Sequence, residues 1–357
     1  MSDQEMSGFR HATNLLRGVS GLAILITHYQ HFFYIGVVRR SDWNISIQPL
    51  SNLLKPAYEY GGFAVQIFWC ISGLILAHTY INQTRTRLAK FSLARFSRLY
   101  PLHLFTLLVV VAIQFVSAKR FSTFQIYEQN DLYHFLSNLF FVQAWGKLGA
   151  GFSFNAPTWS VSVEILVYFI FFALLPVLRR GKIVTPIALL LGMRFVLEKN
   201  PMIYQEVFFF QCLMCFLAGV SIYFAVTSSK QLARVMTLTV LVVIIRYLIP
   251  AFQPHYASTA LILVCSAAFL DSFPLANRLQ RVRIVGELTY SVFLWHAPLQ
   301  MIILMVMMQF DISHSIAQSP LFLLFFLVLT YSVGYVSYRW IEQPARKFLN
   351  NRFMPAQ

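Results

Sequence analysis

Charged residues are scarce in this chain. Asp, Glu, Lys and Arg make up only 11% of its 357 residues, whereas hydrophobic residues make up 58%. A soluble domain carries about 25% charged residues, because it must cover a surface that faces water. The low charge content and the mean hydropathy of +0.62 therefore exclude a soluble globular protein. Apolar runs of about 20 residues, each long enough to cross a bilayer, recur along the chain and predict a polytopic membrane protein.

Cysteine is also rare. The chain has only four cysteines, Cys70, Cys212, Cys215 and Cys265, and all of them lie within apolar segments. Thiols in such surroundings favour packing over redox chemistry. Cys212 and Cys215 form a CxxC pair, but a metal site needs more ligands close by, so we expect no metal site.

The apolar segments predict an all-α polytopic membrane protein with about ten transmembrane helices in a single domain over residues 1–357. Residues 1–13 are polar and no small-residue cleavage site follows the first span, so we expect no cleaved signal peptide. The apolar segment 132–145 is too short to cross a bilayer, and we interpret it as a short interfacial or re-entrant helix. The predicted spans lie at about 14–38, 61–80, 99–118, 158–178, 183–199, 203–226, 232–251, 257–272, 284–308 and 319–341.

The distribution of basic residues predicts the orientation in the membrane. The chain has 28 Lys and Arg against 13 Asp and Glu, a formal net charge of +15. With the N-terminus inside, most of the basic residues fall in cytoplasmic segments, in agreement with the positive-inside rule. We therefore expect both termini in the cytoplasm. No basic stripe is interleaved with exposed polar structure, so the charge reflects topology and we expect no nucleic-acid partner.

Two ionisable residues lie within NLLRGVSGLAILITH (14–28), the first part of the predicted span at 14–38. Arg17 and His28 are separated by about three helical turns, so they share nearly one face and differ in height by about 16 Å. Arg17 is expected near the cytoplasmic entrance and His28 near mid-membrane. Ionisable groups within a membrane usually face an internal polar cavity. The alternative is that His28 is a hydrogen-bonded packing residue.

A second basic pair precedes the third span, in LARFSRLYPLHL (93–104). Arg95 and Arg98 are one helical turn apart, and Pro101 lies in the first turn of the span, where proline is well suited. Ordinary positive-inside anchoring explains such a pair. The alternative is that both arginines bind phosphate groups at the inner mouth of a cavity, since guanidinium forms strong charge-assisted hydrogen bonds with phosphate.

These motifs continue along the chain in a fixed order. The Arg17–His28 pair and the Arg95–Arg98 pair are two of six motifs. The other four are FWCISGLIL (68–76), which lies between these pairs, and PTWSVSVEILVY (157–168), GELTYSVFLWHAPL (286–299) and YRWIEQPARKF (338–348), which follow them. Together the six motifs resemble the acyltransferase-3 family of integral membrane acyltransferases, which modify polysaccharides and other cell-surface molecules. Some members of that family continue into a soluble esterase-like domain, whereas we expect this chain to be the membrane domain alone.

The resemblance implies transfer of an acyl group, with acetyl as the default, from cytoplasmic acyl-CoA to an acceptor on the outer side. The implied acceptor is a hydroxyl of a cell-surface or secreted polysaccharide or glycolipid. Acyl-CoA is a co-substrate, so no tightly bound cofactor is expected. The implied location, among membrane lipids, is a bacterial inner membrane. A non-enzymatic polysaccharide exporter or transporter on the same fold is the alternative, and it would not need His28.

The resemblance also assigns roles to the charged residues. His28 is the predicted catalytic base, because an imidazole of near-neutral pKa can take a proton from a hydroxyl that attacks a thioester. Arg17, Arg95 and Arg98 are predicted to bind the phosphates of acyl-CoA. Glu164, expected about two turns below the outer face, is the second predicted catalytic residue. It orients His28, binds the acceptor hydroxyl, or pairs with an interior arginine such as Arg194 or Arg246, because a buried carboxylate needs a partner.

Five further residues are candidates for the acceptor site or its pocket. Trp159 and Ser160 are expected at the outer end of the fourth span, where Trp159 either stacks on a sugar ring or belongs to an interfacial aromatic belt. His31 follows His28 on nearly the same face. The ninth span contributes Tyr290 and His296, and His296 either joins the pocket or makes a structural hydrogen bond.

Overall fold

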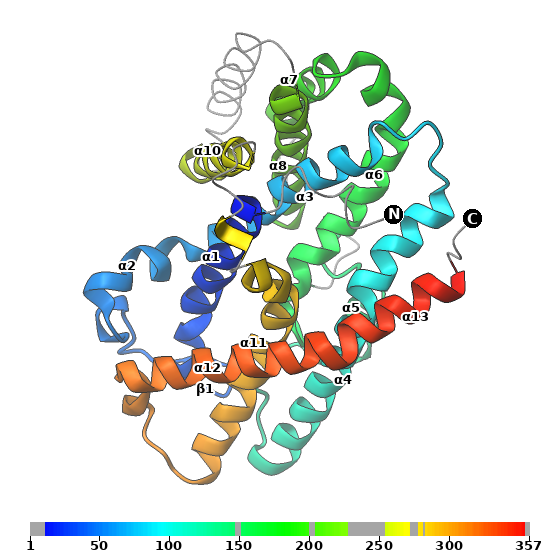
Figure 1. Cartoon of the computed structure of the whole chain (residues 1–357). Coiled ribbons are helices and arrows are strands. Elements are labelled where there is room, and N and C mark those ends of the chain that lie inside the picture. Colours follow the sequence, from blue (N-terminus) through cyan, green and yellow to red (C-terminus); the bar gives the residue numbers. More distant parts are fainter. Residues whose placement is uncertain are drawn as a thin grey trace.

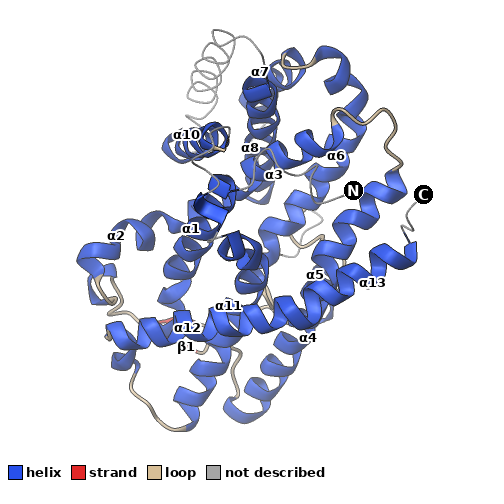
Figure 2. Cartoon of the chain, in the orientation of Figure 1, coloured by secondary structure: helices blue, strands red, loops and turns tan. Residues whose placement is uncertain are grey.

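In the computed structural model the chain is almost entirely helical (Figures 1 and 2). The structure describes residues 11–146, 151–199, 204–227, 254–271, 278–280 and 283–353. In these ranges the only strands are β1 (Tyr34–Ile35) and β2 (Val38–Arg39), which pair as a short antiparallel hairpin. The predicted all-α class is confirmed for the part of the chain that is described.

The helices follow one another with short connections. A π-helical turn at Tyr338–Glu342 joins α12 to α13, and 3₁₀ turns occur at Tyr29–Phe33, Ile45–Ile47, Gly61–Phe63, Ala156–Thr158 and His314–Gln318. The α-helices are α1 (His11–His28), α2 (Ser51–Tyr60), α3 (Ala64–Tyr80), α4 (Leu88–Phe121), α5 (Leu132–Leu139), α6 (Trp159–Gly181), α7 (Val184–Lys199), α8 (Tyr204–Thr227), α10 (Pro254–Leu270), α11 (Arg283–Gln309), α12 (Pro320–Ser337) and α13 (Gln343–Phe353).

Six helical stretches within the described residues are long and apolar enough to cross a membrane. The predicted count of about ten spans is therefore not confirmed. Val184–Met193 and Thr259–Leu270 are shorter apolar helices, and the predicted span at 232–251 lies outside the described residues. The six stretches are Ser51–Tyr80, Leu88–Phe121, Ala156–Gly181, Glu206–Thr227, Arg278–Gln309 and Pro320–Phe353.

The first helix ends earlier than the sequence predicts. The expected span reaches residue 38, whereas α1 ends at His28 and the chain continues as a 3₁₀ turn and the β1–β2 hairpin. Gly36, between the two strands, has a φ of 60°, a conformation that glycine adopts without steric cost. The apolar residues after His28 therefore belong to a hairpin that the hydropathy pattern does not distinguish from helix.

The beginning of α1 is fixed by a carboxylate from another helix. Asp271, directly after α10, accepts hydrogen bonds from the backbone N–H groups of His11 (2.9 Å), Ala12 (2.7 Å) and Thr13 (3.1 Å). It also accepts a bond from the Thr13 hydroxyl (2.7 Å). Because the first N–H groups of a helix have no partner within the helix, this carboxylate stabilises the start of α1 and positions it against α10.

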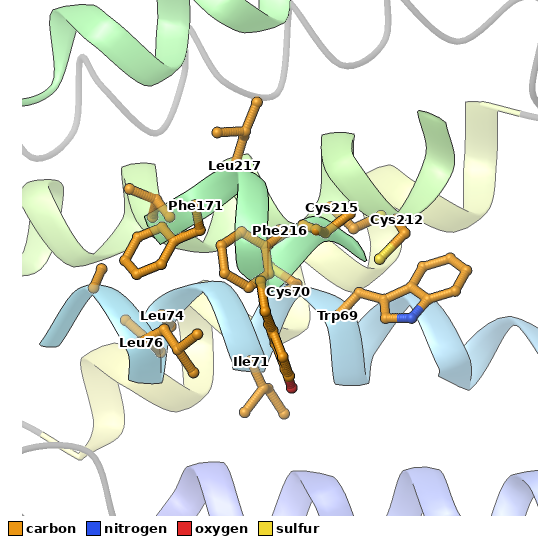
Figure 3. Close-up of a cluster of buried hydrophobic side chains, with 14 of the residues drawn as sticks. Trp69, Cys70, Ile71, Leu74, Leu76, Phe171, Cys212, Cys215, Phe216 and Leu217 are labelled. Carbon is orange, nitrogen blue, oxygen red and sulfur yellow. The ribbon is translucent and has the colours of Figure 1, made fainter. Parts of the chain in front are cut away.

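The largest buried cluster lies where α3 and α8 pack closely together (Figure 3). A side chain at Gly73 would collide with the backbone of Phe216, and one at Gly219 with the backbone of Cys70. Small residues of this kind let two membrane helices approach each other. All four cysteines are free, and each belongs to this cluster or packs against it, as the sequence predicts.

The start of α6 is inside the protein. Ala156–Thr158 and Asn155 are buried, and the Asn155 side chain donates a hydrogen bond to the Leu294 carbonyl (2.9 Å), which lies in the middle of α11. Polar side chains thus satisfy the backbone of a loop that folds back into the bundle. Trp159 and Ser160 lie near one end of the candidate span Ala156–Gly181, and their expected place on the outer side stays a prediction.

Candidate active site

A cavity that is partly open to solvent lies between α1, α3, α4, α6 and α11. Much of the cavity wall is apolar and includes Val65, Phe68 and Ile75. Six of the predicted site residues line this arginine cavity: Arg17, Arg95, Arg98, Ser160, Glu164 and Tyr290.

The three arginines reach the cavity from two helices. Arg17 comes from α1, and Arg95 and Arg98 come from successive turns of α4. Among the described residues, none of the three has a carboxylate oxygen within the 4.0 Å of an ion pair. The Arg95 guanidinium lies over the Tyr168 ring at 6.0 Å from its centroid, and its Nε is buried with no hydrogen-bond partner. These positive charges are therefore available to an anionic ligand.

Glu164 belongs to the same cavity. Its carboxylate is buried and close enough to Arg98 and Arg17 to interact with their charges, and its Oε1 atom has no hydrogen-bond partner. The structure thus places Glu164 near two of the predicted donor-binding arginines. Arg246 and the Arg194 side chain lie outside what the structure describes.

His28 lies in a separate group of three imidazoles, which we call the histidine cluster: His28, His31 and His296. The ring centroid of His28 is 4.9 Å from that of His296 and 5.3 Å from that of His31. His31 and His296 are buried, and His28 is partly exposed. The described residues contain no group of three His, Cys, Asp or Glu side chains arranged to hold a metal ion.

Two of these imidazoles are oriented by backbone carbonyls at the end of the arginine cavity. His28 Nδ1 contacts the Ile24 carbonyl oxygen at 3.0 Å, and His296 Nδ1 contacts the Phe293 carbonyl oxygen at 2.5 Å. A carbonyl oxygen only accepts, so each Nδ1 carries the proton and each Nε2 has a free lone pair. Because Ile24 and Phe293 line the cavity, the histidine cluster lies about one helical turn beyond it.

The third imidazole is held through a glutamine. Gln300 Nε2 donates to the His28 carbonyl oxygen (2.8 Å), and Gln300 Oε1 accepts from His31 Nδ1 (3.0 Å). The His31 ring also packs edge-on against Tyr34 and Tyr127. Gln300 therefore connects His31 of the 3₁₀ turn to the last residue of α1.

Ser160 and Tyr290 make hydrogen bonds that position cavity walls. The Tyr290 hydroxyl donates to the Leu99 carbonyl (2.6 Å) and so joins α11 to α4. The Ser160 hydroxyl donates to the Pro157 carbonyl (3.2 Å) within the start of α6. Both side chains are thus already bonded to backbone at the cavity surface.

The structure does not bring Trp159 into the cavity. Its ring packs against Phe208, with centroids 4.2 Å apart, and edge-on against Trp69 at 5.7 Å. These contacts place it in the aromatic packing between α3, α6 and α8. Its stacking on a sugar ring stays a prediction.

Two residues near the site were not predicted. Tyr168 lines the cavity one helical turn after Glu164, within the motif PTWSVSVEILVY, so that motif contained a signal for it. Gln300 follows the GELTYSVFLWHAPL motif directly, and its contact with the end of α1 arises from tertiary packing that no local pattern encodes.

The fold and the site define an integral membrane protein with a basic cavity that ends beside a cluster of oriented histidines. Residues 10–339 match the acyltransferase-3 family, described as an acyltransferase domain, and the chain belongs to this family. The resemblance stated from the motifs is confirmed.

One curated relative supports the same class. Acyltransferase MdmB of Streptomyces mycarofaciens is 29% identical over 162 residues, which cover 44% of this chain and 36% of that protein. The matched region thus spans little more than a third of the relative's length. No solved structure matches the chain.

Proposed function

We propose that this protein is a membrane O-acyltransferase that moves an acyl group, with acetyl as the default, from cytoplasmic acyl-CoA to a hydroxyl on the outer side of the membrane. The family supports an acyl donor and an acceptor. The proposed acceptor is a cell-surface or secreted polysaccharide or glycolipid, and the proposed location is a bacterial inner membrane with both termini in the cytoplasm.

The observation that carries the proposal is the continuity between the arginine cavity and the histidine cluster. Arg17 lines the cavity, and the Ile24 carbonyl at its wall orients His28 on the same helix. Acyl-CoA has phosphates at one end and a thioester at the other, joined by the thin pantetheine arm. Phosphates bound by the arginines would leave the arm to extend along α1, so that the thioester reaches His28.

His28 is suited to act as a general base in this reaction. Its Nε2 lone pair takes the proton of the acceptor hydroxyl while the hydroxyl oxygen attacks the thioester carbonyl carbon. A C–O bond forms, the C–S bond breaks, and the proton passes from His28 to the departing thiolate. The apolar cavity walls, among them Ile24 and Phe293, limit water near the thioester and so limit its hydrolysis.

Purified protein incubated with labelled acetyl-CoA tests the proposal. The wild type should release CoA slowly without an acceptor and faster with acceptor glycans, and His28→Ala should lose both activities. His134→Asn is a matched control, because His134 pairs with Asp131 and Gln129 and does not belong to the cavity or the cluster. Wild-type protein that neither releases CoA nor transfers the acyl group to any acceptor glycan would contradict the enzymatic proposal and favour an exporter, whereas equal CoA release by the wild type and His28→Ala would contradict only the role of His28.

The same preparation distinguishes direct transfer from a covalent route. We propose direct transfer, because the cavity and the outer side of the histidine cluster would admit donor and acceptor together. A covalent route would place the acyl group on His28 when the acceptor is absent. Acyl-histidine found in a donor-only digest, formed and discharged at the rate of turnover, would contradict direct transfer.

A further inference from the structure

Helix α13 and the π-helical turn before it carry polar residues near α4. Glu342 in the turn and Arg346 and Asn350 in α13 are spaced four residues apart, so they lie close to one side of the helix. α13 packs against α4 (Figure 1), the helix that carries Arg95 and Arg98. The C-terminal helix thus extends the basic region beyond the cavity.

Glu342 anchors this face to the site. It is buried in the π-helical turn before α13, and its Oε2 accepts a hydrogen bond from the Ser291 hydroxyl of α11 (2.6 Å). Single π-helical turns within α-helices are frequent at functional sites. The Arg346 guanidinium, about one turn further along, is close enough to interact with the charges of Glu342, Arg98 and Arg95.

The region has more positive than negative charge. Four guanidinium groups face two carboxylates, and among the described residues no ion pair within 4.0 Å joins any of them. Cations that are close together and lack direct partners repel each other, so an anion that binds among them is strongly favoured. The residues concerned are Arg17, Arg95, Arg98, Arg346, Glu164 and Glu342.

Two buried polar atoms on α4 and α13 also lack partners. Arg95 Nε and Asn350 Oδ1 are buried without a hydrogen bond, whereas buried polar atoms in proteins are almost always paired. Each lies on one of the two helices that pack together here. The oxygen of an anionic ligand beside α4 would supply the acceptor that Arg95 Nε lacks.

Arg346 differs from the three cavity arginines in its position. It does not line the cavity, and its side chain is exposed. In acyl-CoA the 5′-diphosphate joins the pantetheine arm to the ribose, and the 3′-phosphate lies on the far side of that ribose. The arginine farthest out along the basic region therefore corresponds to the phosphate farthest from the thioester.

We propose that Arg346 binds the 3′-phosphate of the acyl-CoA donor, outside the cavity whose arginines bind the diphosphate. The inference rests on the proposed use of acyl-CoA. A phosphate monoester presents several oxygens to the planar guanidinium and forms charge-assisted hydrogen bonds with it. Arg346 thus selects CoA thioesters over donors that lack this phosphate.

The test compares CoA with 3′-dephospho-CoA, which differ only in this group, by calorimetric titration of the full chain in nanodiscs. The wild type should bind CoA about tenfold or more tightly than 3′-dephospho-CoA, the size expected for one charge-assisted contact. Arg346→Gln should bind 3′-dephospho-CoA as the wild type does and lose the preference for CoA to within about twofold. Arg346→Lys should keep part of the preference.

Two controls separate a specific contact from general surface charge. Arg352→Gln removes the same charge from the same helix at another exposed position, and it should keep the wild-type preference. Arg95→Gln should weaken both ligands equally, because its proposed partner is the diphosphate that both contain. Unchanged 3′-dephospho-CoA binding by Arg346→Gln also shows that the variant is folded.

Several outcomes would overturn the inference. The inference fails if Arg346→Gln keeps the wild-type preference for CoA, or if Arg352→Gln loses that preference to the same extent as Arg346→Gln. It also fails if the wild type binds CoA and 3′-dephospho-CoA with the same affinity. In each of these cases the proposed acyltransferase function stands, because CoA still binds. A wild type that binds neither ligand would contradict the proposed function itself.

Discussion

The arginine cavity and the histidine cluster are adjacent, yet they are built in opposite ways. In the cavity, Arg17, Arg95 and Arg98 have long side chains and no carboxylate within ion-pair distance among the described residues. In the cluster, His28 and His296 are each fixed by a bond from Nδ1 to a carbonyl oxygen. The cavity offers charge without a fixed partner, and the cluster offers oriented lone pairs.

The difference indicates that the arginine cavity binds the donor and that the histidine cluster transfers the proton. Binding of a phosphate-bearing ligand gains most from charges that no neighbour has neutralised, whereas proton transfer requires a nitrogen held in the productive geometry. Helix α1 connects the two regions, since it carries Arg17 in its second turn and His28 at its end. Mutations in the two regions should therefore produce separable defects.

The largest effect is expected from the loss of the His28 imidazole. His28→Ala should lower the rate of acyl transfer at saturating donor by about 10²–10⁴-fold, the usual contribution of a general base. Single-turnover transfer from labelled acetyl-CoA to surface glycan measures this rate. Full activity in the variant would remove His28 from the mechanism.

Next in size is the loss of a cavity arginine. Arg98→Ala and Arg95→Ala should each weaken acyl-CoA binding about tenfold or more, because a charge-assisted phosphate contact is worth about 1.5–3 kcal/mol. Arg179→Ala is the matched control. Arg179 donates to the backbone carbonyls of Tyr80 (2.9 Å) and Ile81 (3.2 Å), so its loss should lower the Tm and leave the affinity unchanged. If Arg95 and Arg98 only anchor the topology, both variants will bind CoA normally.

A smaller effect is expected from the glutamine that supports the histidine cluster. Gln300→Leu removes the bonds to His31 and to the His28 carbonyl, which should let the end of α1 shift. A lost neutral hydrogen bond is worth about 1 kcal/mol, so kcat should fall about fivefold with an unchanged KM for acyl-CoA. A change in KM without a change in kcat would assign Gln300 to the donor side.

The smallest effect on activity is expected from the packing between α3 and α8. Gly73→Ala places a methyl group against the Phe216 backbone, whereas Gly192→Ala meets no atom within 4 Å. Overpacking costs about 1–3 kcal/mol, so Gly73→Ala should lower the Tm while the folded fraction keeps the wild-type kcat and KM. Equal Tm values for the two variants would show that α3 and α8 adjust easily.

Much of the site follows from short motifs. Arg17, Arg95, Arg98, Glu164, Ser160 and Tyr290 were all predicted and all line one cavity, because each lies on a helix whose apolar pattern is strong. The separation of His28 from that cavity follows from the carbonyls of Ile24 and Phe293, which are tertiary details. Periodicity identifies the helices that carry such residues, and it does not give the depth at which each side chain lies.

The errors arise where the chain folds back on itself. The apolar segment after His28 has the composition of a helix, but the turn at Gly36 makes it a hairpin. The chain before α6 is buried, and the Asn155 side chain bonds to α11, a tertiary contact that the sequence pattern does not predict. Hydropathy identifies the segments that avoid water, but it does not distinguish a spanning helix from a buried loop.

The affinity of His28→Ala for acetyl-CoA is the most direct test of the division of labour between the arginine cavity and the histidine cluster. Calorimetric titration in nanodiscs, side by side with Arg98→Ala, gives both values under the same conditions. The account predicts that His28→Ala binds acetyl-CoA within about twofold of the wild type, whereas Arg98→Ala binds about tenfold more weakly. A loss of affinity in His28→Ala as large as that in Arg98→Ala would contradict the separation of donor binding from chemistry.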